Sequence, residues 1–186
     1  MKRLRKMIEP LKMTPFALSL QHKRITLNFA NADFSDQLWK TIEQDKKDRE
    51  AIWEWIKNQD DVGEYLKDVS QENPSKEVVY TISTENASCI GTLHLHSISH
   101  WNHKLELGYW IAKKFEGQGY VSEALQCVED EARRQGFHRI EIKCNADNIR
   151  SVNLANKNGF LLEGTGRQDC VENGIFRDTC HFGKIL

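Results

Sequence analysis

Alternating apolar and polar residues predict most of the strands of this chain. Between residues 23 and 30, Ile25, Leu27 and Phe29 alternate with polar residues, which indicates a strand with one buried face. Further strands are predicted at 77–83, 89–98, 104–112 and 138–144. Short polar links join the first three of these segments, so they are expected to form an antiparallel meander.

Apolar residues that recur at helical spacing predict the next elements. The segment 33–69 is expected to be helical, with one apolar face around Leu38 and Ile42 and a second around Trp53 and Ile56. A proline-containing stretch then ends the helical pattern before the meander begins.

The second half of the chain contains two further predicted helices and a hairpin. The helix at 119–135 ends at Gly136, and the shorter helix at 148–158 begins with an asparagine cap. The final segment is expected to be a hairpin that turns at Asn173-Gly174. The order of strands and helices therefore predicts an α/β (α+β) domain around one mixed sheet, rather than a βαβ repeat.

Length and local composition predict a single domain. The chain has 186 residues, enough for one core, and contains no repeat or linker that would divide it. Its basic start, MKRLRKMIEPLKM, is interrupted by Glu9 and Pro10, so residues 1–21 are expected to be an N-terminal extension rather than a signal peptide.

Charge and cysteine content exclude several classes of function. The net charge of −1 argues against bulk attraction to nucleic acid or membranes, and the longest apolar runs are too short to span a bilayer. The five cysteines lack a C-x-x-C pair, which favours a reducing, cytoplasmic environment without a disulfide framework. His94, His96, His100 and His103 lie close together but lack zinc-ligand spacing, so no metal site is predicted.

The stretch KKFEGQGYVSEAL, residues 113–125, has a glycine-rich turn that opens a helix. A P-loop is excluded because no Gly-Lys-Ser/Thr is present, and the dinucleotide fingerprint fails because Ser122 stands where its third glycine belongs. A turn that binds the pyrophosphate of coenzyme A remains, since Gly117, Gly119 and the helix N-terminus would present backbone amides to an anion. These residues alone leave an ordinary strand-to-helix turn equally open.

The wider context of this turn resembles a known family. ELGYWIAKKFEGQGYVSEAL, followed after one strand by DNIRSVNLANKNGFLLEG, resembles the GNAT acetyltransferase superfamily, and within it the ribosomal-protein N-terminal (serine/alanine) acetyltransferases of the RimJ/RimL type. Trp53 and Trp55 are similar to the tryptophan-rich helical region of that branch. The resemblance implies a GNAT domain at 22–186, with a twisted, mostly antiparallel sheet and helices on both faces.

The resemblance also implies an activity and a cofactor site. The expected reaction is direct transfer of acetyl from acetyl-CoA to an amine, most simply the N-terminus of a ribosomal protein. The resemblance places the backbone of Trp110 and Ile111 against the pantetheine arm, and Asn148 and Ser151 near the pantetheine or thioester. The pyrophosphate would be held by the amides of Glu116, Gly117, Gln118, Gly119 and Tyr120. Lys114 stands where the family motif has Gln or Arg, which keeps a positive charge but loses the planar fork.

Three residues are candidates for the proton transfers. Alternation places Glu106, Gly108 and Trp110 on one face of their strand, where a carboxylate would be either a general base or a salt-bridged surface group. Glu163 is a second candidate base, with a structural glutamate at a strand end as its alternative. Ser151, three residues after the helix cap, is a candidate proton donor or ligand of the coenzyme, with an ordinary helix-start serine as its alternative.

Other functions stay open on the sequence alone. One alternative is a chemically different acceptor, for example a polyamine or an aminoglycoside. Another is a non-catalytic acyl-CoA-binding module, which would keep the turn without the chemistry. A homodimer built on the C-terminal hairpin is expected from the resemblance. No nucleic-acid or membrane partner is predicted.

Overall fold

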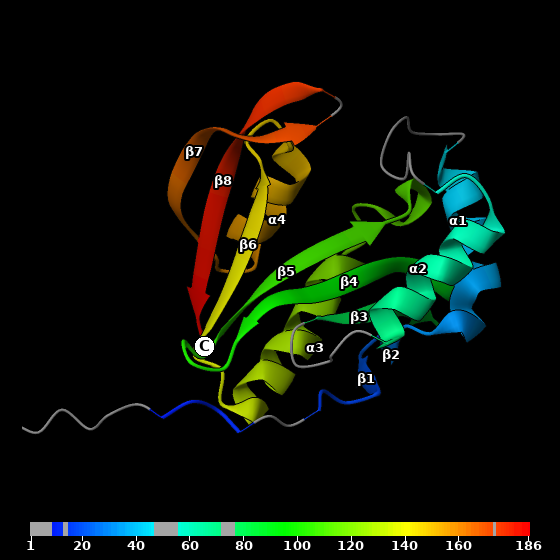
Figure 1. Ribbon diagram of the computed structural model, residues 1–186, viewed down its shortest axis with the longest axis horizontal. Helices are drawn as coiled ribbons and strands as arrows, with labels where there is room; N and C mark the ends of the chain where they lie inside the picture. The colour runs from blue at the N-terminus through cyan, green and yellow to red at the C-terminus, as the bar shows by residue number, and fades with distance from the viewer. Residues whose placement is uncertain (1–8, 13–14, 47–55, 72–76, 173) are drawn as a thin grey trace, which may run out of the picture.

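The computed structural model describes residues 9–12, 15–46, 56–71, 77–172 and 174–186. Its strands form one eight-stranded sheet in the order β1-β2-β3-β4-β5-β6-β8-β7 (Figure 1). The strands are β1 Ser19–His22, β2 Ile25–Phe29, β3 Val78–Thr84, β4 Ala87–Ser99, β5 Lys104–Ile111, β6 Arg139–Asn145, β7 Leu161–Glu172 and β8 Ile175–Ile185. The α-helices are α1 Ser35–Lys46, α2 Gln59–Gln71, α3 Tyr120–Gln135 and α4 Ile149–Lys157, and the 3-10 helices are η1 Ala32–Phe34 and η2 Lys113–Phe115.

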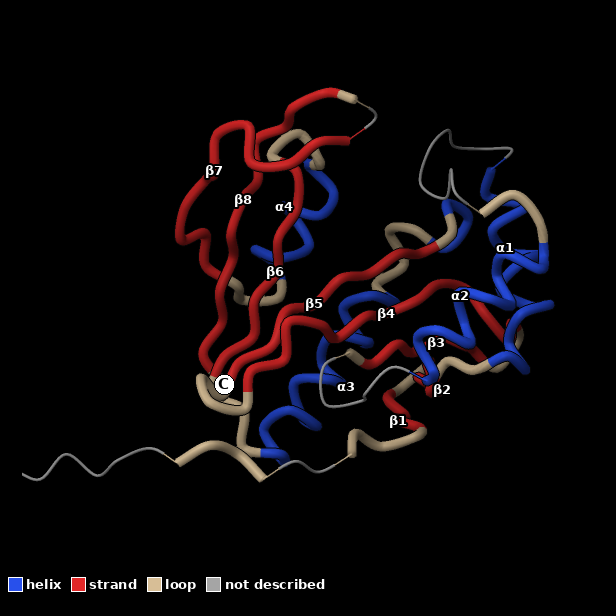
Figure 2. The backbone as a smooth tube through the Cα atoms, viewed as in Figure 1, coloured by secondary structure: helices blue, strands red, loops and turns tan. Residues whose placement is uncertain are grey.

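Strands β5 and β6 are parallel, while the other neighbouring strands of the sheet are antiparallel. The parallel pairing extends only from Lys104–Arg139 to Leu107–Ile142. Beyond it, β5 continues along β4, and β6 continues along β8 as far as Asn145. The two strands therefore diverge, and the sheet opens between them (Figures 1 and 2).

Helices cover both faces of the sheet, as the family resemblance implies. The apolar stripe of α3 packs on one face, in a core that includes Leu105 and Leu107 of β5. On the other face, α1 and α2 enclose a second core that includes Trp110. The alternation read from the sequence is therefore confirmed, because neighbouring residues of β5 lie in different cores.

The end of β5 depends on a close approach between backbones. A Cβ atom at Gly91 of β4 would lie 2.2 Å from the carbonyl oxygen of Trp110 and 2.9 Å from the Cα of Ile111. Any side chain at this position would push β4 and β5 apart. Gly91 therefore determines where the last residues of β5 lie.

The segment before residue 22, expected to be an extension, packs on the domain where it is described. The Phe16 side chain is buried in the core, and the hydroxyl of Tyr80 donates a hydrogen bond of 2.7 Å to the carbonyl of Ala17. Residues Ser19–His22 form the edge strand β1, which the sequence did not predict because its residues are half-exposed. Trp53 and Trp55 lie outside the described residues, as does Asn173, although β7 and β8 flank the predicted turn.

We expect Gly91→Ala to lower the free energy of unfolding by about 1–3 kcal/mol, because the new methyl group overlaps the backbone of Trp110. Urea denaturation with the protein's own fluorescence would measure the change. The matched control is Gly63→Ala in α2, where a Cβ meets nothing within 4 Å. This change should raise the free energy of unfolding by at most about 1 kcal/mol, because alanine favours the helix over glycine. Equal stability of the two variants would contradict the proposed role of the close approach.

Candidate active site

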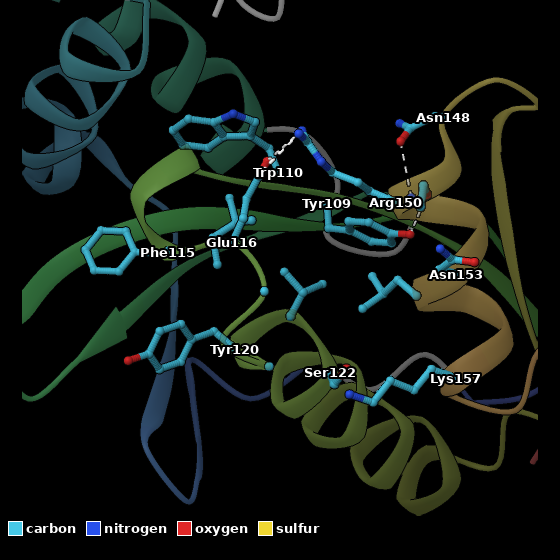
Figure 3. A pocket seen from close by; sticks show the side chains of 16 residues that line it. Tyr109, Trp110, Phe115, Glu116, Tyr120, Ser122, Asn148, Arg150, Asn153 and Lys157 are labelled. Atoms are coloured by element: carbon cyan, nitrogen blue, oxygen red, sulfur yellow. Dashed lines mark hydrogen bonds and ion pairs between the residues drawn. The ribbon is translucent and has the colours of Figure 1, made fainter. Parts of the chain in front are cut away.

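A cavity of about 700 Å³ opens where β5 and β6 diverge. It lies between the end of β5, the turn before α3, and α4 (Figure 3). The residues around it include Tyr109, Trp110, Ile111, Glu116, Gly117, Gly119, Tyr120, Ser122, Asn148, Arg150, Ser151, Asn153 and Lys157. Most of the residues expected to hold a cofactor thus lie together at one cavity.

The turn before α3 has the backbone conformation that only glycine adopts readily. Gly117 has φ 70° and Gly119 has φ 87°, both in the left-handed region. Gly119 is the N-cap of α3 and contributes no side-chain hydrogen bond to the first turn. The first amides of a helix have no carbonyl partner within the helix and carry partial positive charge. The turn therefore has the features of an anion-binding site.

Helix α4 brings a serine to the cavity beside a tyrosine of β5. Asn148 caps the helix, and its Oδ1 accepts a 3.2 Å hydrogen bond from the amide of Ser151. Ser151 is a buried residue, and its hydroxyl lies 2.6 Å from the hydroxyl of Tyr109. Burial raises the pKa of Tyr109 to about 12, although the hydrogen bond with Ser151 acts in the opposite direction. Tyr109 is thus protonated at neutral pH.

Tyr109 is a site residue that sequence reasoning missed. Alternation placed it on the apolar face with Leu105 and Leu107, and the structure confirms that face. Its contact with Ser151 joins residues 42 positions apart, so no local pattern could have revealed it. Cys144 packs against the same core, and burial raises the pKa of its thiol.

Glu106 lies on the opposite face of β5, and its side chain is buried by neighbouring polar groups. Its Oε2 forms a 2.9 Å ion pair with Lys143, and its Oε1 lies 4.0 Å from Nε2 of His96. The hydrogen bond with Glu106 raises the pKa of Lys143. Glu106 is the next-to-last β5 residue of the parallel pairing, one residue before β5 and β6 begin to diverge. Its carboxylate is therefore at the gap, on the face away from Tyr109 and Ser151.

The structure does not bring Glu163 to the cavity. Arg139 binds its carboxylate with both terminal guanidinium nitrogens and also donates to Glu141. Arg139 is the first residue of β6 and aligns with Lys104, the first residue of β5. The guanidinium hydrogen bond lowers the pKa of Glu163. Glu163 is thus an ion-paired, solvent-exposed carboxylate at the far end of the parallel pairing.

Two expected cofactor residues have side chains directed elsewhere. The ammonium of Lys114 lies 4.8 Å from the centre of the Phe115 ring, and its residue borders a smaller hollow with Asp45 instead of the main cavity. The side-chain amide of Gln118 donates to the carbonyl of Lys114. Only backbone groups of these two residues could face an anion in the turn.

Three polar residues of α4 that face the cavity were also missed. Arg150, Asn153 and Lys157 occur at i, i+3 and i+7, which places them on one face of a helix. This spacing was readable from the sequence once the helix at 148–158 was predicted. Arg150 reaches across the cavity to the carboxylate of Glu116, with a closest contact of 3.3 Å (Figure 3).

No group of three His, Cys, Asp or Glu side chains suited to a metal ion is found within the described ranges. None of the helices in the described part of the chain combines the length and apolar character needed to cross a membrane.

We expect Asn148→Ala to cost about 1 kcal/mol of stability, since the first turn of α4 loses its side-chain cap. Asn148→Asp should keep most of the wild-type stability, because aspartate also caps helices well. Asn156→Ala, an exposed change in the last turn of the same helix, is the control and should be neutral or slightly stabilising. Thermal unfolding followed by circular dichroism measures all three, and an Asn148→Ala protein as stable as the Asn156→Ala protein would refute the cap.

Comparison with known sequences identifies relatives of this chain. A family model described as an acetyltransferase (GNAT) domain matches residues 22–161. A ribosomal-protein-serine acetyltransferase of Escherichia coli (strain K12) is 35% identical over 98 residues, which are 52% of this chain and 55% of that relative. YdaF of Bacillus subtilis (strain 168), by its name a candidate ribosomal N-acetyltransferase, is 30% identical over 160 residues, 75% of this chain and 86% of that relative.

Solved structures agree with these matches. The microcin C7 self-immunity acetyltransferase MccE, in complex with acetyl-CoA and AMP, has a TM-score of 0.82 and 26% identity over 88% of this chain and 93% of that chain. RimL, a ribosomal L7/L12 alpha-N-protein acetyltransferase in complex with coenzyme A, has a TM-score of 0.82 and 25% identity over 90% of this chain and 98% of that chain. The family match covers more than half of the sequence, and the fold agrees with it. This chain belongs to the GNAT acetyltransferase family.

Proposed function

We propose that this protein transfers the acetyl group of acetyl-CoA directly to an amine, and that the amine is the N-terminus of a ribosomal protein. The observation that carries the proposal is the arrangement at the gap between β5 and β6. The hydroxyl pair of Tyr109 and Ser151 lies on one face of the sheet, and the Glu106 carboxylate lies on the other. An amine that attacks a thioester must lose a proton, and the leaving thiolate must gain one. The sheet keeps the two groups that would do this apart.

The cavity supplies groups that fit the coenzyme. The left-handed turn and the N-terminus of α3 offer amides of Gly117, Gly119 and Tyr120 to a diphosphate. Trp110 and Ile111 line the cavity beyond the last β5–β6 pair, where an extended, amide-bearing arm can lie along β5 as an added strand would. Cationic Arg150 and Lys157 face the same space, which favours a ligand with several phosphates.

The proton transfers follow from the two faces. Glu106 accepts the proton of the incoming amine through Oε1, because Oε2 is held by Lys143. Backbone groups at the end of β5 hold the thioester carbonyl while the new C–N bond forms and the C–S bond breaks. Ser151 donates its hydroxyl proton to the departing sulfur, and Tyr109, protonated at neutral pH, replaces that proton. Solvent then returns a proton to Tyr109, and Glu106 releases to solvent the proton that it took from the amine. A thiol nucleophile is not required, in agreement with the raised pKa of Cys144.

The names of the relatives favour a protein N-terminus as acceptor. They include a ribosomal-protein-serine acetyltransferase and an alanine N-acetyltransferase of ribosomal protein uS5, both of Escherichia coli (strain K12), and RimL. A ribosomal acceptor would place the reaction in the cytoplasm. A small-molecule amine, such as a polyamine or an aminoglycoside, is the second possible acceptor, and a panel of acceptors distinguishes it from a protein N-terminus.

We expect free thiol to be released when the protein is mixed with acetyl-CoA and short peptides that copy ribosomal-protein N-termini beginning with serine or alanine. A thiol-reactive dye measures the rate. The same peptides with an acetylated N-terminus are the matched control. With them, thiol release should be no faster than the background hydrolysis of acetyl-CoA.

The acceptor panel also contains polyamines and aminoglycosides. Faster reaction with these than with every peptide would refute the ribosomal acceptor and leave acetyl transfer intact. If the protein binds acetyl-CoA but no amine accelerates the release of free thiol, catalysis is refuted.

A pair of variants distinguishes Glu106 from Glu163 as the general base. We expect Glu106→Gln to lower kcat by about 100-fold or more, because the amide cannot accept the proton of the amine. The KM for acetyl-CoA should stay nearly constant, since Glu106 lies outside the cavity. Glu163→Gln should change kcat by less than about twofold, given its pairing with Arg139. Steady-state kinetics that reverse these two effects would make Glu163 the base.

A further inference from the structure

Arg24, in the turn between β1 and β2, reaches the turn that precedes α3. Its Nη2 donates a 2.7 Å hydrogen bond to the carbonyl of Gln118, and its Nε donates a 2.8 Å hydrogen bond to the carboxylate of Glu123. The guanidinium carbon also lies 4.6 Å from the centre of the Tyr120 ring. One side chain therefore contacts the glycine turn and two residues in the first turn of α3, Tyr120 and Glu123.

The contact with Gln118 determines the direction of an amide. The carbonyl of Gln118 and the N–H of Gly119 belong to one planar trans peptide, so they point in opposite directions. Arg24 holds the carbonyl toward the β1–β2 hairpin, and Gly119 lines the cavity on the other side. The N–H of Gly119 is consequently directed away from Arg24, toward the space where an anion would be bound.

The contact with Glu123 removes an unfavourable charge. Glu123 lies in the first turn of α3, and its residue is only 8% exposed. Burial alone would raise the pKa of Glu123, but hydrogen bonds from the side chain and backbone of Arg24 lower it overall, so the group is a carboxylate. Without its partner this carboxylate would repel a diphosphate bound at the same helix end.

We propose that Arg24 is a positioning residue for the diphosphate of acetyl-CoA. It acts through the turn, by orienting the Gly119 amide and neutralising Glu123, and it is not among the residues that line the cavity. The inference rests on the proposed function, because it needs acetyl-CoA to be the ligand of this turn.

A purely structural tie between the hairpin and α3 is the competing explanation, which an acetyl donor without a diphosphate tests. The same helix contains a control for the loss of an Arg–Glu ion pair as such. At the other end of α3, Arg134 forms two short hydrogen bonds with Glu131, through Nε at 2.7 Å and Nη2 at 2.6 Å. This pair has the same chemistry as Arg24–Glu123 but lies far along the helix from the turn. Arg134→Gln therefore removes an equivalent ion pair without touching the site.

The test compares Arg24→Gln, Arg24→Lys and Arg134→Gln with the wild type. Isothermal titration with coenzyme A should give a Kd raised about 10- to 150-fold for Arg24→Gln, the range for a lost hydrogen bond to a charged group. Arg24→Lys should be intermediate, because it keeps the charge but not the fork that reaches both partners. Arg134→Gln should bind as the wild type does. Thermal unfolding confirms that each variant is folded.

Kinetics separate positioning from a general effect on structure. In Arg24→Gln, KM for acetyl-CoA should rise by the same factor as Kd while kcat changes less than about twofold. With S-acetylpantetheine, which lacks the diphosphate, kcat/KM of the variant and the wild type should be equal. Equal losses with both acetyl donors, or an equal loss in Arg134→Gln, would overturn the proposal.

The titrations also separate this inference from the proposed function. If the wild type binds coenzyme A and Arg24→Gln binds it equally well, the role of Arg24 is refuted and the acetyltransferase proposal stands. If the wild type does not bind coenzyme A, both are refuted.

Discussion

The short parallel pairing of β5 with β6 is the constraint on which the site depends. Four residue pairs, from Lys104–Arg139 to Leu107–Ile142, join two parts of the sheet that are otherwise antiparallel. Past these pairs each strand follows its other neighbour, because Gly91 lets β4 and β5 stay in close contact and β8 holds β6. The gap that results exposes one edge of β5 to the cavity. It also gives access to both faces of the sheet at one point.

That access explains how an acid and a base can coexist in so small a site. A carboxylate and a hydroxyl in direct contact would hydrogen-bond to each other and be unavailable to substrates. Here Glu106 is oriented by Lys143 on one face, while Ser151 is oriented by Tyr109 and the Asn148 cap on the other. The period of two along a strand is enough to produce this separation, since Glu106 and Tyr109 are three residues apart.

Much of this arrangement could be predicted from the sequence, and the remainder could not, for a physical reason. Alternation along β5, the cap of α4 and the glycines of the turn are local properties, and local pattern predicted each of them. Contacts between distant segments leave no such pattern. The hydrogen bond from Arg24 to Gln118 spans 94 positions. Likewise, nothing near Glu163 in the sequence indicates that Arg139 binds it.

The edge strand β1 illustrates why a weak local signal can still matter for the site. Its four residues are exposed or half-exposed, so alternation gave no reason to predict a strand there. Pairing with β2 nevertheless forms the turn that carries Lys23, at φ 46°, and then Arg24. A residue in that turn can contact α3 because β1 and β2 lie beside this helix, and Phe16, shortly before β1, is buried in the core on which α3 packs. The hairpin is therefore part of the structure that positions the turn before α3, although the sequence of β1 itself does not indicate a strand.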